Sequence, residues 1–352
     1  MGTWRPDSFA FKARSSGPHR CAVSRSREGA PLGTDVRQTG IPVDLVTLLA
    51  PRDEPSDLTI AVGIATRGRA PILQETLHEL DRQYRRPDRV IICATEPADL
   101  DGIAFGPGTL TVLYSDPGLP RQRNKILDEA GDADIVVFLD DDFLPAPDYL
   151  SEMEAAFAND RYLAVATGTV IADGITGPGF SAEEGRAVLL DDWIAHGPID
   201  KRMDPTFCGY GCNMAVRMET VRRHGVRVDE RLQLYGWQED VDFTRRLGRH
   251  GGIARLSAAR GVHLGTKSGR GSGLNLGYSQ IANPLYLAYK SRGGAYPLSY
   301  ALIRISRNLA ANVGKALTPE PFVDRRGRLK GNLLAIKDLV SGRLRPERAG
   351  RL

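Results

Sequence analysis

The feature that most constrains the fold is an apolar run, Ile135–Leu139, that leads directly into Asp140, Asp141 and Asp142. Five consecutive apolar residues, β-branched and aromatic among them, predict a strand buried on both faces, which is typical of a parallel sheet packed between helices. Adjacent carboxylates repel one another and prefer water, so three of them at the end of a buried strand indicate a neutralising cation. Ligands of open α/β sheets also bind at this carboxyl end.

Predicted strands and helices alternate on both sides of this run. The first strand, Leu58–Ile64, leads into the polar loop Thr66–Arg69, and Pro71 suits the first turn of the next helix. Further strands are expected at 90–94, 110–114, 164–171, 211–216 and 253–257, with helices at 121–130, 149–157, 218–224 and from the 235–243 segment to Gly251. This alternation predicts an α/β fold with a mostly parallel, doubly wound sheet.

Three segments depart from this alternation. Residues 173–206 are rich in glycine and acids and weakly periodic, so we expect a surface excursion near the site. Residues 265–273 combine glycines with Lys267 and Arg270, which predicts a mobile basic loop able to close over an anion. From Tyr278 the pattern is helical to about Leu317, and a final helix is expected from 329 to 340.

The bulk properties fit an intracellular globular protein. The length, 352 residues, suits one large α/β domain with extensions or two domains, and a net charge of +4 does not argue for nucleic acid. The cysteines at 21, 93, 208 and 212 have no metal-site spacing and suggest free thiols of a reducing compartment. No apolar run is long enough to span a bilayer. We therefore expect a cytoplasmic protein with a mostly disordered segment at 1–57.

From Leu58 to His263 the chain resembles a family 2 glycosyltransferase of the GT-A fold. The resemblance rests on motifs in a specific order: Thr66-Arg67 after the first strand, Phe138–Asp142, the strand at 211–216, and Trp237-Gln238-Glu239-Asp240. It implies a GT-A domain at 58–275 and a C-terminal helical extension at 276–352, after the extension at 1–57, whose richness in Arg, Ser, Gly and Pro predicts disorder.

The resemblance implies a divalent cation, Mn²⁺ or Mg²⁺, that neutralises the diphosphate of a nucleotide-sugar donor. Asp142 would be the direct ligand, Asp140 would face the ribose or reach the metal through water, and His263 would complete the site. The alternatives without a metal are a solvated turn or a helix N-cap for the acids and a structural role for the histidine. Asp141 is counted with the donor contacts, but an extended backbone turns it to the opposite side, so it should matter less.

The nucleotide is expected across the ends of the first strands. The resemblance assigns Thr66 and Arg67 to the base and diphosphate, and Arg123 and Asn124 to a place beneath the diphosphate. Arg121 lies close by in sequence, and a solvated helix face is the alternative for these arginines. Glu96 stands where the family commonly has an aspartate that binds the base. This departure leaves open the preference for a UDP-sugar.

The acceptor side is expected at the second acidic motif. By resemblance Asp240 takes the proton of the acceptor hydroxyl and Glu239 orients the acceptor or the base. Trp237 would stack on a sugar, and Asn213 is a further acceptor contact. The alternative is that both acids complement a helix N-terminus and that Trp237 belongs to the core.

These inferences predict a metal-dependent, inverting glycosyltransferase that acts on a carbohydrate or lipid-linked acceptor in polysaccharide or glycolipid synthesis. A sugar-nucleotide pyrophosphorylase is the nearest competing enzyme, although the loop at 66–69 is poor in the glycines that cradle a triphosphate. A catalytically silent nucleotide- or sugar-binding protein is the third possibility. The apolar stripe Leu302, Ile305, Leu309 and Val313, flanked by arginines, suggests peripheral contact with the inner face of a membrane or a helix packed on the domain.

Overall fold

The computed structural model describes residues 57–105, 109–197, 199–268, 271–292, 294–318 and 320–352. All of them belong to one compact unit, Leu49–Leu352. The segment predicted to be disordered, 1–57, lies outside the described residues except for its last residue. Cys93, Cys208 and Cys212 are free thiols, and Cys21 lies outside the described residues.

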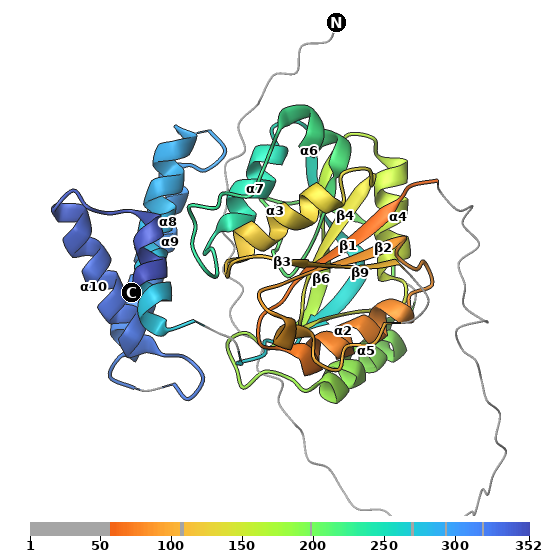
Figure 1. The fold of residues 1–352 in the computed structure, drawn as a ribbon, viewed down its shortest axis with the longest axis horizontal. Coiled ribbons are helices and arrows are strands. Elements are labelled where there is room, and N and C mark those ends of the chain that lie inside the picture. Colours follow the sequence, from red (N-terminus) through yellow and green to blue (C-terminus); the bar gives the residue numbers. More distant parts are fainter. Residues whose placement is uncertain (1–56, 106–108, 198, 269–270, 293, 319) are drawn as a thin grey trace, which may run out of the picture. The chain divides into compact units, whose positions relative to one another are not determined.

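The N-terminal half of the sheet is parallel, as the alternation predicts. Strands run in the order β3 (Thr109–Tyr114), β2 (Arg89–Ala94), β1 (Ile60–Ala65) and β4 (Ile135–Asp140), and every neighbouring pair is parallel (Figure 1). Helices α2 (Ala70–Asp81) and α3 (Leu119–Glu129) and the short turn η1 (Pro97–Leu100) connect them. The carboxyl ends of these strands therefore share one edge of the sheet.

The C-terminal half is mixed, so the expectation of a mostly parallel sheet is right only for the first half. Strand β8 (Asn213–Arg217) lies antiparallel between β4 and β6 (Leu163–Asp173), and β6 pairs in parallel with β9 (Gly252–His263). The short strands β5 (Phe143–Pro145) and β7 (Met203–Pro205) pair antiparallel with β9. The chain leaves β6 at the carboxyl edge of the sheet and enters β8 from that same edge. Strand β8 therefore runs antiparallel to β4 and β6.

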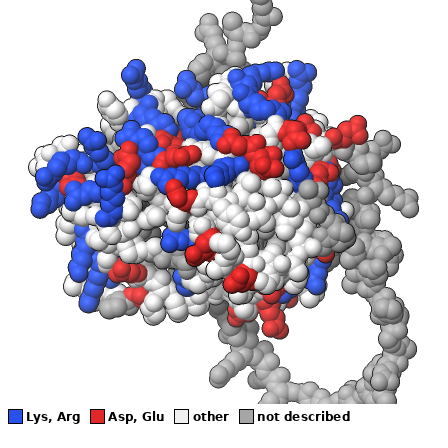
Figure 2. All heavy atoms as spheres, in the orientation of Figure 1, with Lys and Arg blue, Asp and Glu red and all other residues white. Residues whose placement is uncertain are grey.

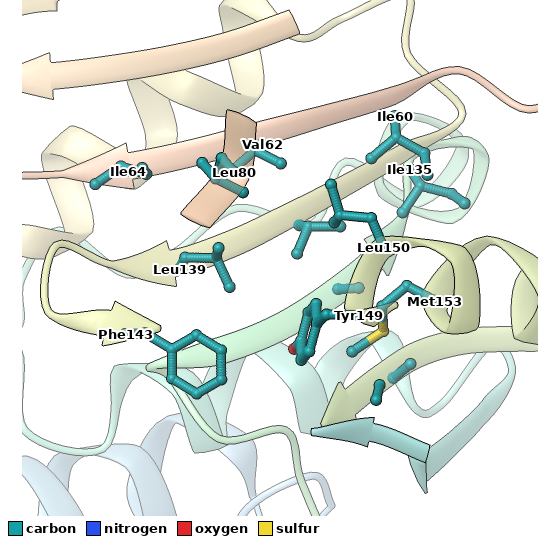
Figure 3. Packing of buried hydrophobic residues seen from close by; sticks show 14 of the residues in the cluster. Ile60, Val62, Ile64, Leu80, Ile135, Leu139, Phe143, Tyr149, Leu150 and Met153 are labelled. Atoms are coloured by element: carbon teal, nitrogen blue, oxygen red, sulfur yellow. The ribbon is translucent and has the colours of Figure 1, made fainter. Parts of the chain in front are cut away.

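Helices cover both faces of the sheet. On one face, α2 and α4 (Tyr149–Asn159) pack on the alternating apolar residues of β1 and β4, which Figure 3 shows converging from both strands. On the other face lie α3, α6 (Met218–His224) and α7 (Glu239–Leu247). Because both faces are covered, the five apolar residues of β4 are all buried, as the opening run predicts.

Helix α5 (Ala182–His196) was not expected, because residues 173–206 show little periodicity. Its apolar residues do not form one stripe: Leu190 and Ile194 are 58% and 72% exposed. The start of the helix does carry a sequence signal. The Ser181 hydroxyl accepts from the Glu184 amide while the Glu184 carboxylate accepts from the Ser181 amide, a complete capping box.

The expected helix from Tyr278 to Leu317 is two helices, α8 (Gly273–Ser291) and α9 (Leu298–Lys315). The chain leaves α8 through Arg292 in a left-handed conformation and re-enters a helix after Pro297, whose fixed φ suits a helix start. The final helix, α10 (Arg325–Val340), begins four residues earlier than predicted and is followed by η2 (Pro346–Arg351). The separate strand expected at 253–257 is the first half of the long β9.

Helices α8 and α10 cross at two glycines, Gly277 and Gly331. A Cβ atom on Gly331 would overlap the backbone carbonyl of Leu274 and lie 2.6 Å from the Tyr278 amide nitrogen. We expect Gly331→Ala to destabilise the protein by about 1–3 kcal/mol, since backbone cannot move aside as a flexible side chain can. Gly314→Ala, in α9 with open space around it, is expected to stabilise by roughly 0.5–1 kcal/mol. Urea unfolding of both variants measures this difference, and equal effects would contradict the tight crossing.

Candidate active site

The two acids and the histidine expected to bind metal come together at the carboxyl edge of the sheet. Asp140 ends β4, and pairing of Phe143 in β5 with His263 in β9 brings the histidine beside Asp142. One ligand atom from each of Asp140, Asp142 and His263 lies within 4.8 Å of the others. Among the described residues, no other group of three His, Cys, Asp or Glu side chains is arranged this way.

His263 lies between two carboxylates. Its Nδ1 is 2.9 Å from Asp173 at the end of β6, and its Nε2 is 3.3 Å from Oδ1 of Asp142. Burial alone would lower the pKa of His263, but these carboxylates raise it to about 10. Burial would raise the pKa of Asp142, yet His263 and Arg69 lower it to about 2. The protonated His263 therefore lies between two carboxylates, and the same negative surroundings suit a bound cation.

The donor atoms fit a divalent cation. Oδ1 of Asp142 is buried and has no partner apart from Nε2 of His263 at 3.3 Å, whereas Oδ2 accepts from the Thr266 amide at 2.7 Å. Carboxylate oxygens and an imidazole nitrogen are ligands that a manganese-like ion accepts. The hydrogen bond from His263 Nδ1 to Asp173 is the kind of outer contact that orients a metal-ligating histidine.

Asp141 points away from this group, as the extended backbone predicts. It accepts hydrogen bonds from the Thr66 hydroxyl at 2.8 Å and from Arg69 at 2.9 Å, and burial raises its pKa to about 7. Arg69 also donates to the carbonyls of Ser268 and Thr266, so it joins the first loop, the acids and the glycine-rich loop. The Thr66 hydroxyl is thus used inside the protein, while Arg67 is exposed.

Arg123 connects the first acidic motif to the second. It is fully buried in α3, and its guanidinium pairs with Glu239 and lies 3.3 Å from Asp140. It also donates to the Gly211 carbonyl at 2.6 Å. Burial raises the pKa of Glu239 to about 8 despite this arginine, because Asp240 and Asp140 add negative charge. The buried guanidinium of Arg123 thus interacts with carboxylates of both acidic motifs.

Asn124 and Arg121, close to Arg123 in the sequence, have different surroundings. Asn124 is buried and exchanges two 2.9 Å hydrogen bonds with the backbone of Val228, which fixes the segment leading to the second motif. Arg121 is more exposed and lies 3.6 Å from Asp116. Asn124 therefore positions the chain, and Arg121 is the one that faces the surface.

The second motif sits on a strained turn, Leu234–Gln238. Leu234 and Gln238 have φ values of 56° and 72°, and Gly236 between them has 64°. Left-handed conformations of this kind cost on the order of 1–3 kcal/mol each for ordinary residues and cluster at functional sites. The C-terminal helices hold the turn: Asn283 donates to the Trp237 carbonyl, and the Tyr296 hydroxyl donates to Gln238.

Asp240 stands in the first turn of α7, just after this turn. Its Oδ2 accepts from the Gly211 amide at 3.0 Å, and burial raises its pKa. Trp237 is partly buried, 6.3 Å from the Tyr235 ring. Asn213 lies in the expected strand, as the first residue of β8. It is fully buried and its Oδ1 accepts from the Thr167 hydroxyl, so this oxygen is used inside the protein.

The carboxyl ends of β2 and β3 border a pocket of about 510 Å³. Six of its lining residues are Thr95, Ser115, Asp116, Arg121, Asn124 and Lys125. Glu96 is exposed beside it, and the buried acid at this edge is Asp99, which sequence reasoning missed. Asp99 accepts hydrogen bonds from Gly68, Thr95 and Glu96, and it fixes the first loop against the end of β2.

Comparison with known proteins identifies the domain. The model of the family described as Glycosyl transferase family 2 matches residues 61–225. Residues 61–225 belong to glycosyl transferase family 2. No curated protein matched the sequence. The family 2 match ends before the Trp237–Asp240 motif and the C-terminal helices.

Solved structures support the GT-A fold. Residues 1–349 of S. aureus TarS align with a TM-score of 0.51 and 14% identity over 82% of each chain. The same protein in complex with UDP-GlcNAc gives 0.50 and 14% over 83% of each chain. A mannosyltransferase from Pyrobaculum calidifontis in complex with GDP-Man and Mn²⁺ gives 0.47 and 16%, over 82% of this chain and 90% of that one. At these identities the TarS likeness shows the fold alone, which is GT-A.

Proposed function

We propose that this family 2 glycosyltransferase is a metal-dependent, inverting enzyme that transfers a sugar from a nucleotide-diphosphate sugar to an acceptor hydroxyl. The observation that carries the proposal is the pairing of two acidic groups through Arg123. One group, Asp140, Asp142 and His263, has the donor atoms of a cation site, and the other, Glu239 and Asp240, lies across the arginine. The cation site would bind the charged diphosphate of the donor, and the second group would accept the proton that the acceptor hydroxyl must lose.

The residues of the chain supply the steps of a single displacement. A carboxylate oxygen of Asp240 accepts the proton of the acceptor hydroxyl as that oxygen bonds to the anomeric carbon. The bond from that carbon to the diphosphate oxygen breaks, and attack from the opposite side inverts the configuration. A divalent cation held by Asp140, Asp142 and His263 would neutralise the charge gained by the leaving diphosphate. Arg123 keeps the two carboxylate groups in place and offsets their mutual repulsion.

The pocket at the ends of β2 and β3 supports a nucleoside next to this centre. A UDP-sugar is the favoured donor, in keeping with the family pattern at the first loop, although Glu96 replaces the usual aspartate. The experiment is a calorimetric screen of UDP-, GDP- and dTDP-sugars with and without Mn²⁺, followed by NMR of the product. Binding that ignores Mn²⁺, or a product with the anomeric configuration of the donor, would contradict the proposal.

Metal binding is expected to release a proton. His263 has a pKa of about 10 because Asp142 and Asp173 hold its protonated form, so near neutral pH it must lose that proton to become a ligand. Affinity for Mn²⁺ should therefore rise with pH below 10, with about one proton released per ion. Calorimetry in two buffers of different ionisation enthalpy measures the release. Tight binding without proton release would remove His263 from the ligand set.

We also propose peripheral contact with an anionic membrane, where a lipid-linked acceptor would be found. None of the helices that the structure describes is long and apolar enough to cross a bilayer. In α9, however, Ile305 packs inside while the outer side exposes Leu298, Leu302, Ile303 and Val313. Lys and Arg side chains gather over these helices, on the left of Figure 2, and 298–352 contain twelve Lys or Arg against four Asp or Glu.

Vesicle sedimentation tests this contact. Binding to vesicles that contain anionic lipid should exceed binding to neutral vesicles and should weaken as salt is added. A Leu302→Ser, Ile303→Ser protein should lose most of this binding, because it removes apolar area without changing charge. Equal recovery with neutral and anionic vesicles would rule the contact out.

A further inference from the structure

Arg304 in α9 is a partly buried cation with no counter-charge. Its guanidinium carbon lies 5.7 Å from the centre of the Trp237 ring, and its Nε is buried without a hydrogen-bond partner. Among the described residues it has no ion pair, whereas the buried Arg123 and Arg260 each pair with a carboxylate. A buried N–H donor without a partner costs free energy.

The surroundings of Arg304 place it on the acceptor side of the proposed centre. Tyr300, one turn earlier in α9, packs on Phe207 with ring centres 4.8 Å apart. Burial raises the pKa of Cys208 to about 12, and the charge of Asp240 raises it while that of Arg304 lowers it. Asp240 and Arg304 therefore both lie close enough to act on the same thiol. Arg304 also contacts Trp237, which stands three residues before Asp240 in the same motif, so the base and this cation belong to one part of the structure.

Aromatic surface adjoins this cation. The Tyr235 ring is 52% exposed and stacks with Trp237, whose Nε1 is buried without a hydrogen-bond partner. Asn283, which is fully buried and donates to the Trp237 carbonyl, has an unpartnered Oδ1. Aromatic rings are a usual means of holding a sugar or polyol. The region thus offers stacking surface and one positive charge.

We propose that Arg304, Trp237 and Tyr235 form an acceptor subsite for a sugar or polyol that carries a phosphate or carboxylate near the accepting hydroxyl. A guanidinium binds both anions through its fork of donors. The anion would supply the counter-charge that Arg304 lacks. The positive charge of Arg304 would in turn offset the repulsion of the anion by Glu239 and Asp240. This inference rests on the proposed glycosyl transfer, because it assigns the acceptor of the same site.

The test measures binding of glucose, glucose 6-phosphate and glucuronate by saturation-transfer NMR to protein saturated with UDP and Mg²⁺. Saturation with UDP keeps the phosphate of the probe out of the donor site. Wild-type protein should bind at least one of the two anions about tenfold or more better than glucose, the effect of one charge-assisted hydrogen bond. Preference for one anion over the other distinguishes a phosphorylated from a carboxylated acceptor.

Variants assign the preference to Arg304. Arg304→Gln should bind all three probes equally, Arg304→Lys should keep part of the preference, and Arg307→Gln, on the exposed side of the same helix, should keep all of it. A merely structural role would lower affinity for every probe without changing their ratio. No preference in the wild type, or an unchanged ratio in Arg304→Gln, overturns the subsite. UDP binding is measured separately in each protein, and its absence would instead overturn the glycosyltransferase proposal.

Discussion

An Asp240→Asn protein is expected to bind a nucleotide sugar as the wild type does and to lose about 10²–10⁴-fold in kcat for transfer, the usual contribution of a general base. The amide has nearly the shape of the carboxylate and can still accept from the Gly211 amide, so the strained turn and α7 should stay in place. It cannot accept the proton of an acceptor hydroxyl. Transfer rates at saturating donor, with donor affinity from calorimetry, separate these two effects.

A matched variant excludes a purely structural explanation. Glu219 is an exposed acid in the first turn of α6, as Asp240 is an acid in the first turn of α7. Glu219→Gln removes the same favourable interaction with a helix N-terminus and should leave transfer unchanged within about twofold. Full activity in the Asp240→Asn protein would show that the carboxylate only complements its helix.

An Asp142→Asn protein is expected to lose Mn²⁺ affinity by at least about 100-fold, whereas Asp141→Asn should lose less than about tenfold. Asp142 turns its Oδ1 toward His263 in the cation site, but Asp141 is turned toward Thr66 and Arg69. Because burial raises the pKa of Asp141 to about 7, a neutral amide resembles a form that the wild type already populates near neutral pH. Electron paramagnetic resonance of free Mn²⁺ in a titration measures both affinities.

Thermal unfolding in the absence of metal complements this titration. Asp141→Asn should lower the unfolding temperature, since it removes the ion pair that anchors Arg69. Equal loss of Mn²⁺ affinity in the two variants would mean that the division between the neighbouring acids is wrong.

The sequence indicates the order of elements better than their directions. Buried apolar runs such as 135–139 identify strands because both faces must be covered, and the parallel β1–β4 half follows from the alternation. The direction of β8 depends on which edge the chain leaves, and periodicity carries no information about that. Helix α5 was not predicted because its apolar residues do not form one stripe, although Ser181 and Glu184 mark its start.

At the site, residues adjacent in sequence to a strand end were easier to predict than those brought in from a distance. Asp140, Asp142 and His263 all follow or end strands, and the structure places them together. The contacts of Asp173 with His263, and of Asp99 with the first loop, depend on pairing between distant strands. Arg304 contacts Trp237 only through the packing of α9, and no pattern in either segment indicates that contact.

Because β8 runs in the reverse direction, two kinds of loop meet at the centre. Loops that follow parallel strands carry the residues of the proposed donor side. The segment before β8 reaches the same edge from the opposite direction and supplies Gly211 and Cys212, whose carbonyl accepts from the Asp140 amide. Gly211 in turn contacts both Arg123 and Asp240. If the proposed sites are right, changes in the connection from β6 to β8 would alter the acceptor side while the strands beside the proposed nucleotide pocket stay unchanged. A protein with this topology could then acquire new acceptors without rebuilding its donor site.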